Sequence, residues 1–230
     1  MTNILSRRAF GGRKGGRDGV RDESRDESRK KTLEMVAVIV LSITSILTAW
    51  SAFQASKWGG AMSIAFSTAS SARIESSTFS GKANATITNQ VGLWTQWAAA
   101  TSAGDTRLAT FLSARFPEPL ATAHRDWLAA GGATAGAPAS PFDMPSYIVP
   151  AQEEANALSD KAGEWFQTAL RDNQRGDNYT LLTVLFAAVL FFAAMSGRPR
   201  AILAQQLLLF MAIGFGLAGT VLLATYPKLV

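Results

Sequence analysis

Four carboxylates within one stretch of twelve residues are the side chains best suited by type and spacing to acid–base chemistry. Two carboxyl groups can serve as general acid and general base when their surroundings separate their pKa values. Lys161 and Arg171 accompany these acids, which is typical of a solvated helix face. We therefore expect no acid–base site here. The four carboxylates are Glu153, Glu154, Asp160 and Glu164.

Other groups that perform chemistry are scarce. The 230 residues include no cysteine and a single histidine, His124. This excludes a disulfide framework, cysteine-ligated zinc, iron–sulfur clusters, a thiol nucleophile and a multi-histidine metal site. The sequence also contains no GxSxG, P-loop or HExxH motif. We expect a protein that is not an enzyme and that uses no cofactor and no metal.

Three long uncharged stretches dominate the chain. They cover residues 35–53, 179–196 and 201–226, and each is close to the roughly 20 residues that cross a bilayer. The alternative, buried helices of a soluble protein, would need far more chain to cover them. We predict an all-α protein with transmembrane helices at 33–53, 179–196 and 201–226.

The distribution of charge predicts the topology. Residues 1–32 hold ten basic and five acidic residues, which accounts for the whole net charge of +5. By the positive-inside rule this tail and the turn at 197–200 are cytoplasmic, whereas residues 54–178 and 227–230 lie outside. Nucleic acid is not expected as a partner, because the basic residues are not accompanied by a folded domain that could recognise it. Four aromatic residues fall at the predicted outer interface as anchors: Trp50, Trp58, Tyr179 and Tyr226.

The basic tail at 1–32 is predicted to be disordered, since it has few apolar residues to bury. Its repeat RDESRDESRK at 21–30 spaces arginines four residues apart, so a transient helix over 21–31 is an alternative. Attraction to anionic membrane lipids is expected for this segment. The basic residues assigned to headgroups are Arg21, Arg25, Arg29, Lys30 and Lys31.

Residues 54–178 are predicted to form an extracytoplasmic helical domain. Two long helices, continuous with the first and second spans, pack antiparallel with a small helical cap between them. Gly59-Gly60 and Gly81 are weak points where we expect the first long helix to kink. The expected cap comprises short helices near 105–116, started by Asp105, and 120–130, followed by a loop at 131–150.

Small residues form a seam along the first span. They recur at steps of three and four, and they allow another helix to approach closely. The seam serves either the packing of a three-helix monomer or self-association, and both alternatives stay open. The seam residues are Ser42, Ser45, Ala49, Ala52, Ser56 and Gly59, and in the third span Gly214, Gly216 and Ala218 with Ala212.

Three segments resemble a family of bacterial three-pass inner-membrane proteins that has no assigned activity. They are TAWSAFQASKWGG at 48–60, SPFDMPSY at 140–147 and NQRGDNYTLLTVLFAAVLFFAA at 173–194. The resemblance covers roughly 40–230 and leaves out the tail. It implies a location in the bacterial cytoplasmic membrane, and it adds no catalytic residue.

These observations favour a non-enzymatic accessory or scaffold subunit that associates with itself or with another membrane protein. One alternative is an oligomeric channel lined by the Ser/Thr face of the first span. Another is a sensor whose outer domain receives a signal, although the tail has no recognisable output domain.

Overall fold

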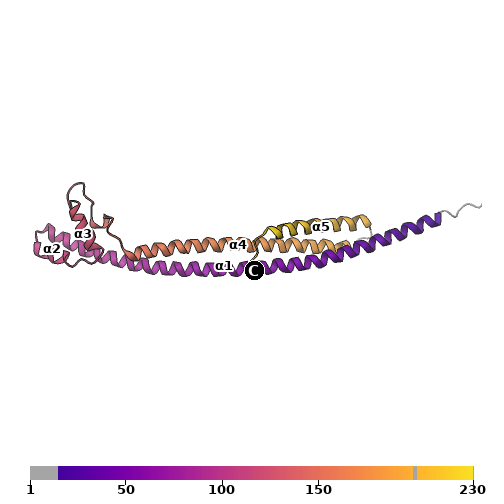
Figure 1. Cartoon of the computed structure of the whole chain (residues 1–230), viewed down its shortest axis with the longest axis horizontal. Helices are drawn as coiled ribbons and strands as arrows, with labels where there is room; N and C mark the ends of the chain where they lie inside the picture. The colour runs from indigo at the N-terminus through magenta and orange to yellow at the C-terminus, as the bar shows by residue number, and fades with distance from the viewer. Residues whose placement is uncertain (1–14, 199–200, 230) are drawn as a thin grey trace, which may run out of the picture. The chain divides into compact units, whose positions relative to one another are not determined.

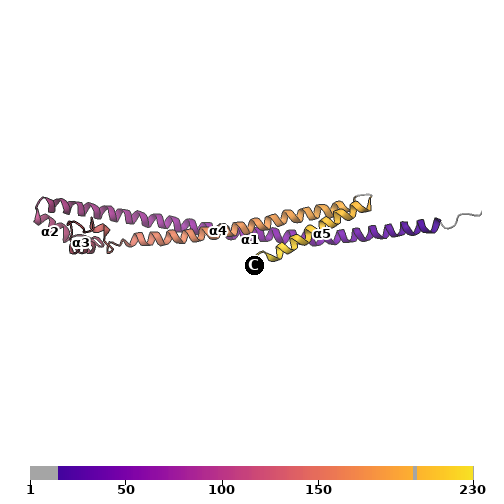
Figure 2. The same cartoon turned by 90° about the horizontal axis from the view of Figure 1, so that it is seen from above.

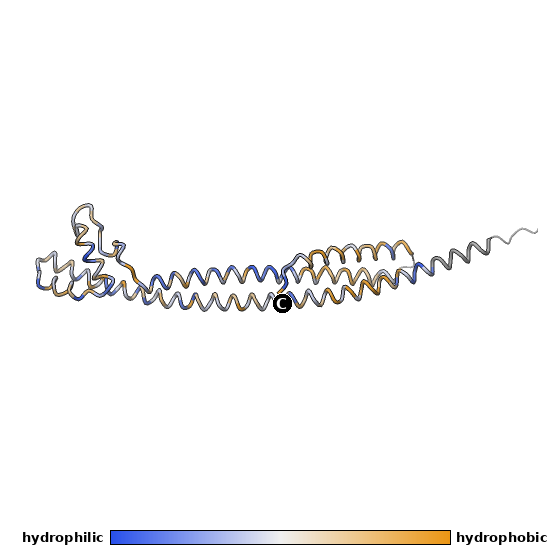
Figure 3. The backbone as a smooth tube through the Cα atoms, in the orientation of Figure 1, coloured by the Kyte–Doolittle hydropathy of each residue, from blue (hydrophilic) through white to orange (hydrophobic). Residues whose placement is uncertain are grey.

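The computed structural model describes residues 15–198 and 201–229, with side chains from residue 27 onward. The described chain forms five α-helices and one short 3-10 helix, and it contains no strand. This confirms the all-α prediction. Three helices are long and apolar enough to cross a membrane, and they contain the three uncharged stretches. In Figure 3 the apolar residues gather on α5 and on the neighbouring stretches of α1 and α4.

Helix α1 runs without interruption from Gly15 to Ser102 and has 88 residues. No break occurs at Gly59-Gly60 or Gly81, so the helix is not segmented there, which is the alternative to a kink. A Cβ atom built at any of these three glycines would meet nothing within 4 Å, so none of them marks a close contact that bends the helix. The helix continues past its glycines because packing along one face outweighs their low helix propensity, which costs about 1 kcal/mol for each glycine.

The start of α1 lies inside the basic tail. Residues 15–32 are helical, in contrast to the disorder expected for the whole segment 1–32, while residues 1–14 lie outside the described chain. The difference has a physical cause in the sequence. An apolar helix that is already formed needs no new nucleus, so it extends into a repeat whose charges are spaced for a helix.

Two compact units divide the chain. The three-helix unit comprises the residues up to Gly60 and those from Asp172 onward, and the hairpin unit comprises Ala61–Arg171. Helices α1 and α4 (Pro150–Ser196) each contribute to both units, and α5 (Ile202–Thr225) belongs to the three-helix unit. The two units are described separately below.

In the hairpin unit, α1 and α4 lie side by side and antiparallel (Figure 1, Figure 2). The Ser76 hydroxyl donates to the Ala155 carbonyl at 2.7 Å, while the rings of Phe66 and Phe166 are 5.6 Å apart. Alanines occupy the positions between the helices at heptad spacing, which permits a close approach. The buried alanines are Ala65, Ala69, Ala72 and Ala83 on α1, and Ala155, Ala162 and Ala169 on α4.

The cap of the hairpin unit contains the two predicted short helices, α2 (Thr106–Ser113) and α3 (Leu120–Ala129). The Asp105 carboxylate accepts from the Leu108 amide at 2.9 Å, which confirms its role as the N-cap of α2. The proline-rich loop adds a 3-10 turn, η1 (Pro141–Asp143). Aromatic rings hold the cap together, and the Trp127 indole donates to the Pro138 carbonyl at 2.7 Å.

Candidate functional site: the faces of the three-helix unit

The three helices of this unit each bury one face. On α1 the buried positions repeat at seven-residue intervals, as expected for a helix packed along one seam. Several of them are polar, so the unit holds hydroxyl and amide groups inside an apolar region. The main buried residues are Ala37, Thr44, Ser51, Gln54 and Trp58 of α1, Tyr179, Leu182, Phe186 and Val189 of α4, and Leu209, Ala212, Gly219 and Leu223 of α5.

Glycine at position 219 allows α5 to approach α4. A Cβ atom there would lie 2.7 Å from Cε1 of Phe186, whose side chain is fully buried. Gly216 is also near α4, with Val189 Cγ1 at 3.7 Å from the position of a Cβ atom. The structure thus places the predicted pair Ala212/Gly216 inside the unit. The second predicted pair, Gly214 and Ala218, is exposed.

The small-residue seam of α1 lies on a different face from the buried one. Ser42, Ser45, Ala49, Ala52 and Ser56 are all exposed, and Gly59 is half-buried. With about 100° per residue, the centre of this seam lies about 140° around the helix from the centre of the buried face. The packing of α1 within the chain therefore leaves the seam uncovered.

Hydroxyl groups on this side of α1 bond to their own helix. Ser42 donates to the Val38 carbonyl at 2.9 Å and Ser45 donates to the Leu41 carbonyl at 2.8 Å. Such bonds satisfy a hydroxyl in an apolar medium without a partner from another helix. The seam therefore presents a strip of small side chains in which the hydroxyl protons of Ser42 and Ser45 are already used.

The last residues of the chain are fastened to the three-helix unit. The Gln54 amide Nε2 donates to the Leu229 carbonyl at 3.3 Å, and the Leu229 amide donates to Gln54 Oε1 at 3.0 Å. The Tyr179 hydroxyl donates to the Pro227 carbonyl at 3.0 Å. We call this set of contacts the C-terminal latch. Sequence reasoning missed it, although a glutamine directly after an uncharged span was a signal.

The four predicted aromatic anchors divide into two groups. Trp50 is exposed and Tyr226 is half-buried, which suits a side chain at a membrane interface. Trp58 is only 5% exposed and Tyr179 is 0% exposed, so these two rings pack inside the unit instead. The guanidinium of Arg175 lies 4.6 Å from the Trp58 ring centre. Trp58 and Tyr179, which lie near the ends of two apolar stretches, are therefore packed within the unit and are not exposed at its surface.

The basic residues assigned to lipid headgroups lie at the start of α1. Arg29, Lys30 and Lys31 are exposed on the described helix. Arg21 and Arg25 belong to α1, but their side chains lie outside the described part of the structure. The exposed amines and guanidinium can meet phosphate groups at a membrane surface.

The residues considered for acid–base chemistry lie in the hairpin unit. The four carboxylates from Glu153 to Glu164 are all exposed along α4. Among the described residues, no three His, Asp or Glu side chains are grouped so as to hold a metal ion. His124 is buried between the rings of Trp97 and Phe116, at 4.4 and 5.1 Å, and burial lowers its pKa. Burial likewise raises the pKa of Tyr147.

Comparisons with protein-family models, curated proteins and solved structures found no match to this chain.

Proposed function

We propose that this protein is a non-enzymatic membrane scaffold that self-associates through the small-residue seam of α1. The observation that carries the proposal is the exposure of Ser42, Ser45, Ala49, Ala52 and Ser56 on a face that the chain's own packing does not use. A strip of small residues lets two helix backbones approach closely, and close van der Waals contact is the main source of helix association in a bilayer.

The hydroxyl bonds within α1 favour a packing surface over the channel. A pore lining would present hydroxyl groups to water, whereas Ser42, Ser45 and Thr48 donate to carbonyls of the preceding turn. With their protons engaged, these side chains act on a neighbouring helix mainly through their small size. The seam then works as a contact surface between two spans.

The proposed arrangement in the membrane follows from charge. The basic tail is cytoplasmic, the hairpin unit is outside a bacterial cytoplasmic membrane, and the C-terminus is also outside. In that arrangement the hairpin unit serves as a platform for assembly outside the membrane, and its partner is a second copy or another membrane protein. Reporter fusions after residue 32 and after residue 130 test this topology.

Native mass spectrometry of the detergent-purified protein tests the self-association. We expect an oligomer for the wild type and a monomer for Ala49→Leu, because a leucine side chain separates the two backbones at the seam. Ala187→Leu is the matched control, since Ala187 is an exposed alanine of α4 and should leave the oligomer intact. A wild-type protein that is strictly monomeric and carries no other protein contradicts the proposal. Ion flux through liposomes that is abolished by Ser45→Leu would favour the channel instead.

A further inference from the structure

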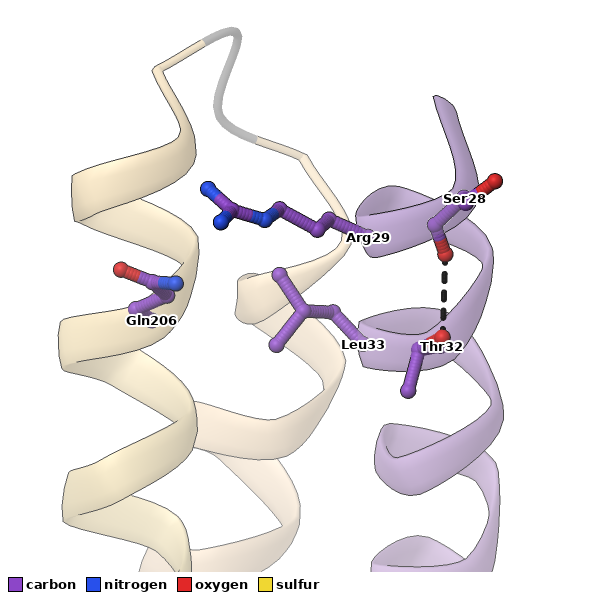
Figure 4. A pocket seen from close by; sticks show the side chains of 5 residues that line it. All are labelled: Ser28, Arg29, Thr32, Leu33 and Gln206. Carbon is purple, nitrogen blue, oxygen red and sulfur yellow. Dashed lines mark hydrogen bonds between the residues drawn. The ribbon is translucent and has the colours of Figure 1, made fainter. Parts of the chain in front are cut away.

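A polar pocket lies between α1 and α5 at the end of the three-helix unit that carries the basic tail. Its volume is about 480 Å³. Arg29 and Leu33 point from α1 towards α5, and Gln206 lies opposite them on α5 (Figure 4). The remaining lining residues, Ser28 and Thr32, come from the same turn of α1. None of these groups has a part in the proposed self-association.

The charge in this pocket selects an anion. Among the described residues, Arg29 is the only charged residue that lines the pocket, and it forms no salt bridge. Of the acidic residues of α1 whose side chains the structure describes, Glu27 and Glu34 lie nearest to Arg29 in sequence, and both are more than about 100° around the helix from it. Asp26, three residues before Arg29, lies about 60° around the helix from it, and its side chain is outside the described part of the structure. A guanidinium presents a fork of N–H donors that matches two oxygens of a phosphate group.

The start of α5 adds to this preference. No side chain caps its N-terminus at Ala201, and its first turn contains no acidic residue. The positive end of the helix dipole at this terminus favours a negatively charged group near the start of α5.

Apolar side chains lie beside the pocket and indicate that its ligand also has an apolar part. Leu33 lines the pocket itself, while Leu203 and Leu207, which flank Gln206 on α5, are 80% and 63% exposed. Free phosphate would leave these side chains uncovered. A molecule with a phosphate group and hydrocarbon chains covers both the polar and the apolar parts.

We infer that this pocket binds the headgroup of an anionic phospholipid from the leaflet on the side of the basic tail. Arg29 binds the phosphate, Gln206 contacts the headgroup oxygens, and the acyl chains run along the apolar surface of α5. The inference rests on the proposed insertion of the three helices in a membrane, but not on self-association through the seam. A lipid held at this place links the first turn of α5 to α1.

Lipid titration of the full chain in a neutral detergent, read by native mass spectrometry, tests the inference. Uncharged micelles have no surface potential, so only local contacts distinguish the lipids. We expect phosphatidylglycerol to bind about tenfold more tightly than phosphatidylcholine, and Arg29→Gln to abolish that preference. Lys57→Gln removes one positive charge from an exposed position of α1 outside the pocket, and should change the affinity by less than about twofold. Gln206→Leu should weaken phosphatidylglycerol binding while leaving phosphatidylcholine unchanged.

Several outcomes would overturn the inference. Equal losses for Arg29→Gln and Lys57→Gln would show a diffuse effect of charge without a pocket. Displacement of the lipid by millimolar inorganic phosphate would show that the pocket takes a soluble anion. The same spectra report the number of chains in each particle, so a monomer that still prefers phosphatidylglycerol refutes the proposed self-association while supporting the lipid site.

Discussion

Replacing Gly219 by alanine tests the contact that joins α5 to α4. The new Cβ atom would lie 2.7 Å from Cε1 and 3.1 Å from Cζ of Phe186, and 3.2 Å from Cδ2 of Leu185. Ordinary van der Waals contact begins near 3.4 Å, so the helices must separate by about 0.7 Å or the ring must move. Phe186 is fully buried, which leaves the ring little room. Overpacking of this kind costs about 1–3 kcal/mol.

Gly214→Ala is the matched control for this variant. It lies in the same helix, and a Cβ atom there meets nothing within 4 Å. Both substitutions gain the same helix propensity, so their difference reports the contact alone. We expect Gly219→Ala to be less stable than Gly214→Ala by about 1–3 kcal/mol in reversible unfolding by SDS in mixed micelles, followed by circular dichroism. Equal stability of the two variants would refute the packing of α5 against Phe186.

Three further changes test other parts of the structure. Gln54→Leu removes both hydrogen bonds to Leu229, so trypsin should cleave after Lys228 roughly tenfold faster; unchanged cleavage would mean that the latch holds without Gln54. Protonation of His124 is disfavoured in the folded hairpin unit, because burial lowers the pKa of this side chain below its ordinary value of 6.5. Stability should therefore fall as the pH drops below about 6.5, by at most about 1.4 kcal/mol per pH unit. This fall should be absent in His124→Phe when thermal unfolding is measured at pH 7 and pH 5. Ala162 is one of the buried alanines between α1 and α4. Ala162→Leu should lower the free energy of unfolding by about 1–3 kcal/mol in chemical unfolding, whereas Ala157→Leu, at an exposed position of α4, should not.

The elements that depend on local sequence could be predicted. The three apolar helices follow from uncharged stretches of sufficient length, and the start of α2 follows from Asp105. Each of these predictions depends on residues that are close together in the chain. The continuity of α1 could not be predicted in this way, since the weak helix propensity of Gly59-Gly60 is outweighed by packing along the opposite helices.

Which face of a helix is buried could not be predicted from the size of its residues. The seam from Ser42 to Ser56 and the buried face from Thr44 to Trp58 both consist largely of small or polar residues, so composition does not separate them. The contacts that decide it join distant parts of the chain, such as Gln54 with Leu229 and Phe186 with Gly219. For the same reason Trp58 and Tyr179 looked like lipid anchors, although both are buried.

Cysteine crosslinking in intact membranes tests the central claim most directly. The natural sequence contains no cysteine, so a single substitution labels one face of one helix. A disulfide needs two Cα atoms within about 7 Å, a distance that only a close helix pair allows. The seam account predicts that Ala49→Cys gives a disulfide-linked dimer on mild oxidation, while the exposed control Ala187→Cys stays monomeric. A dimer that forms equally with both variants, or with Ala187→Cys alone, would contradict it.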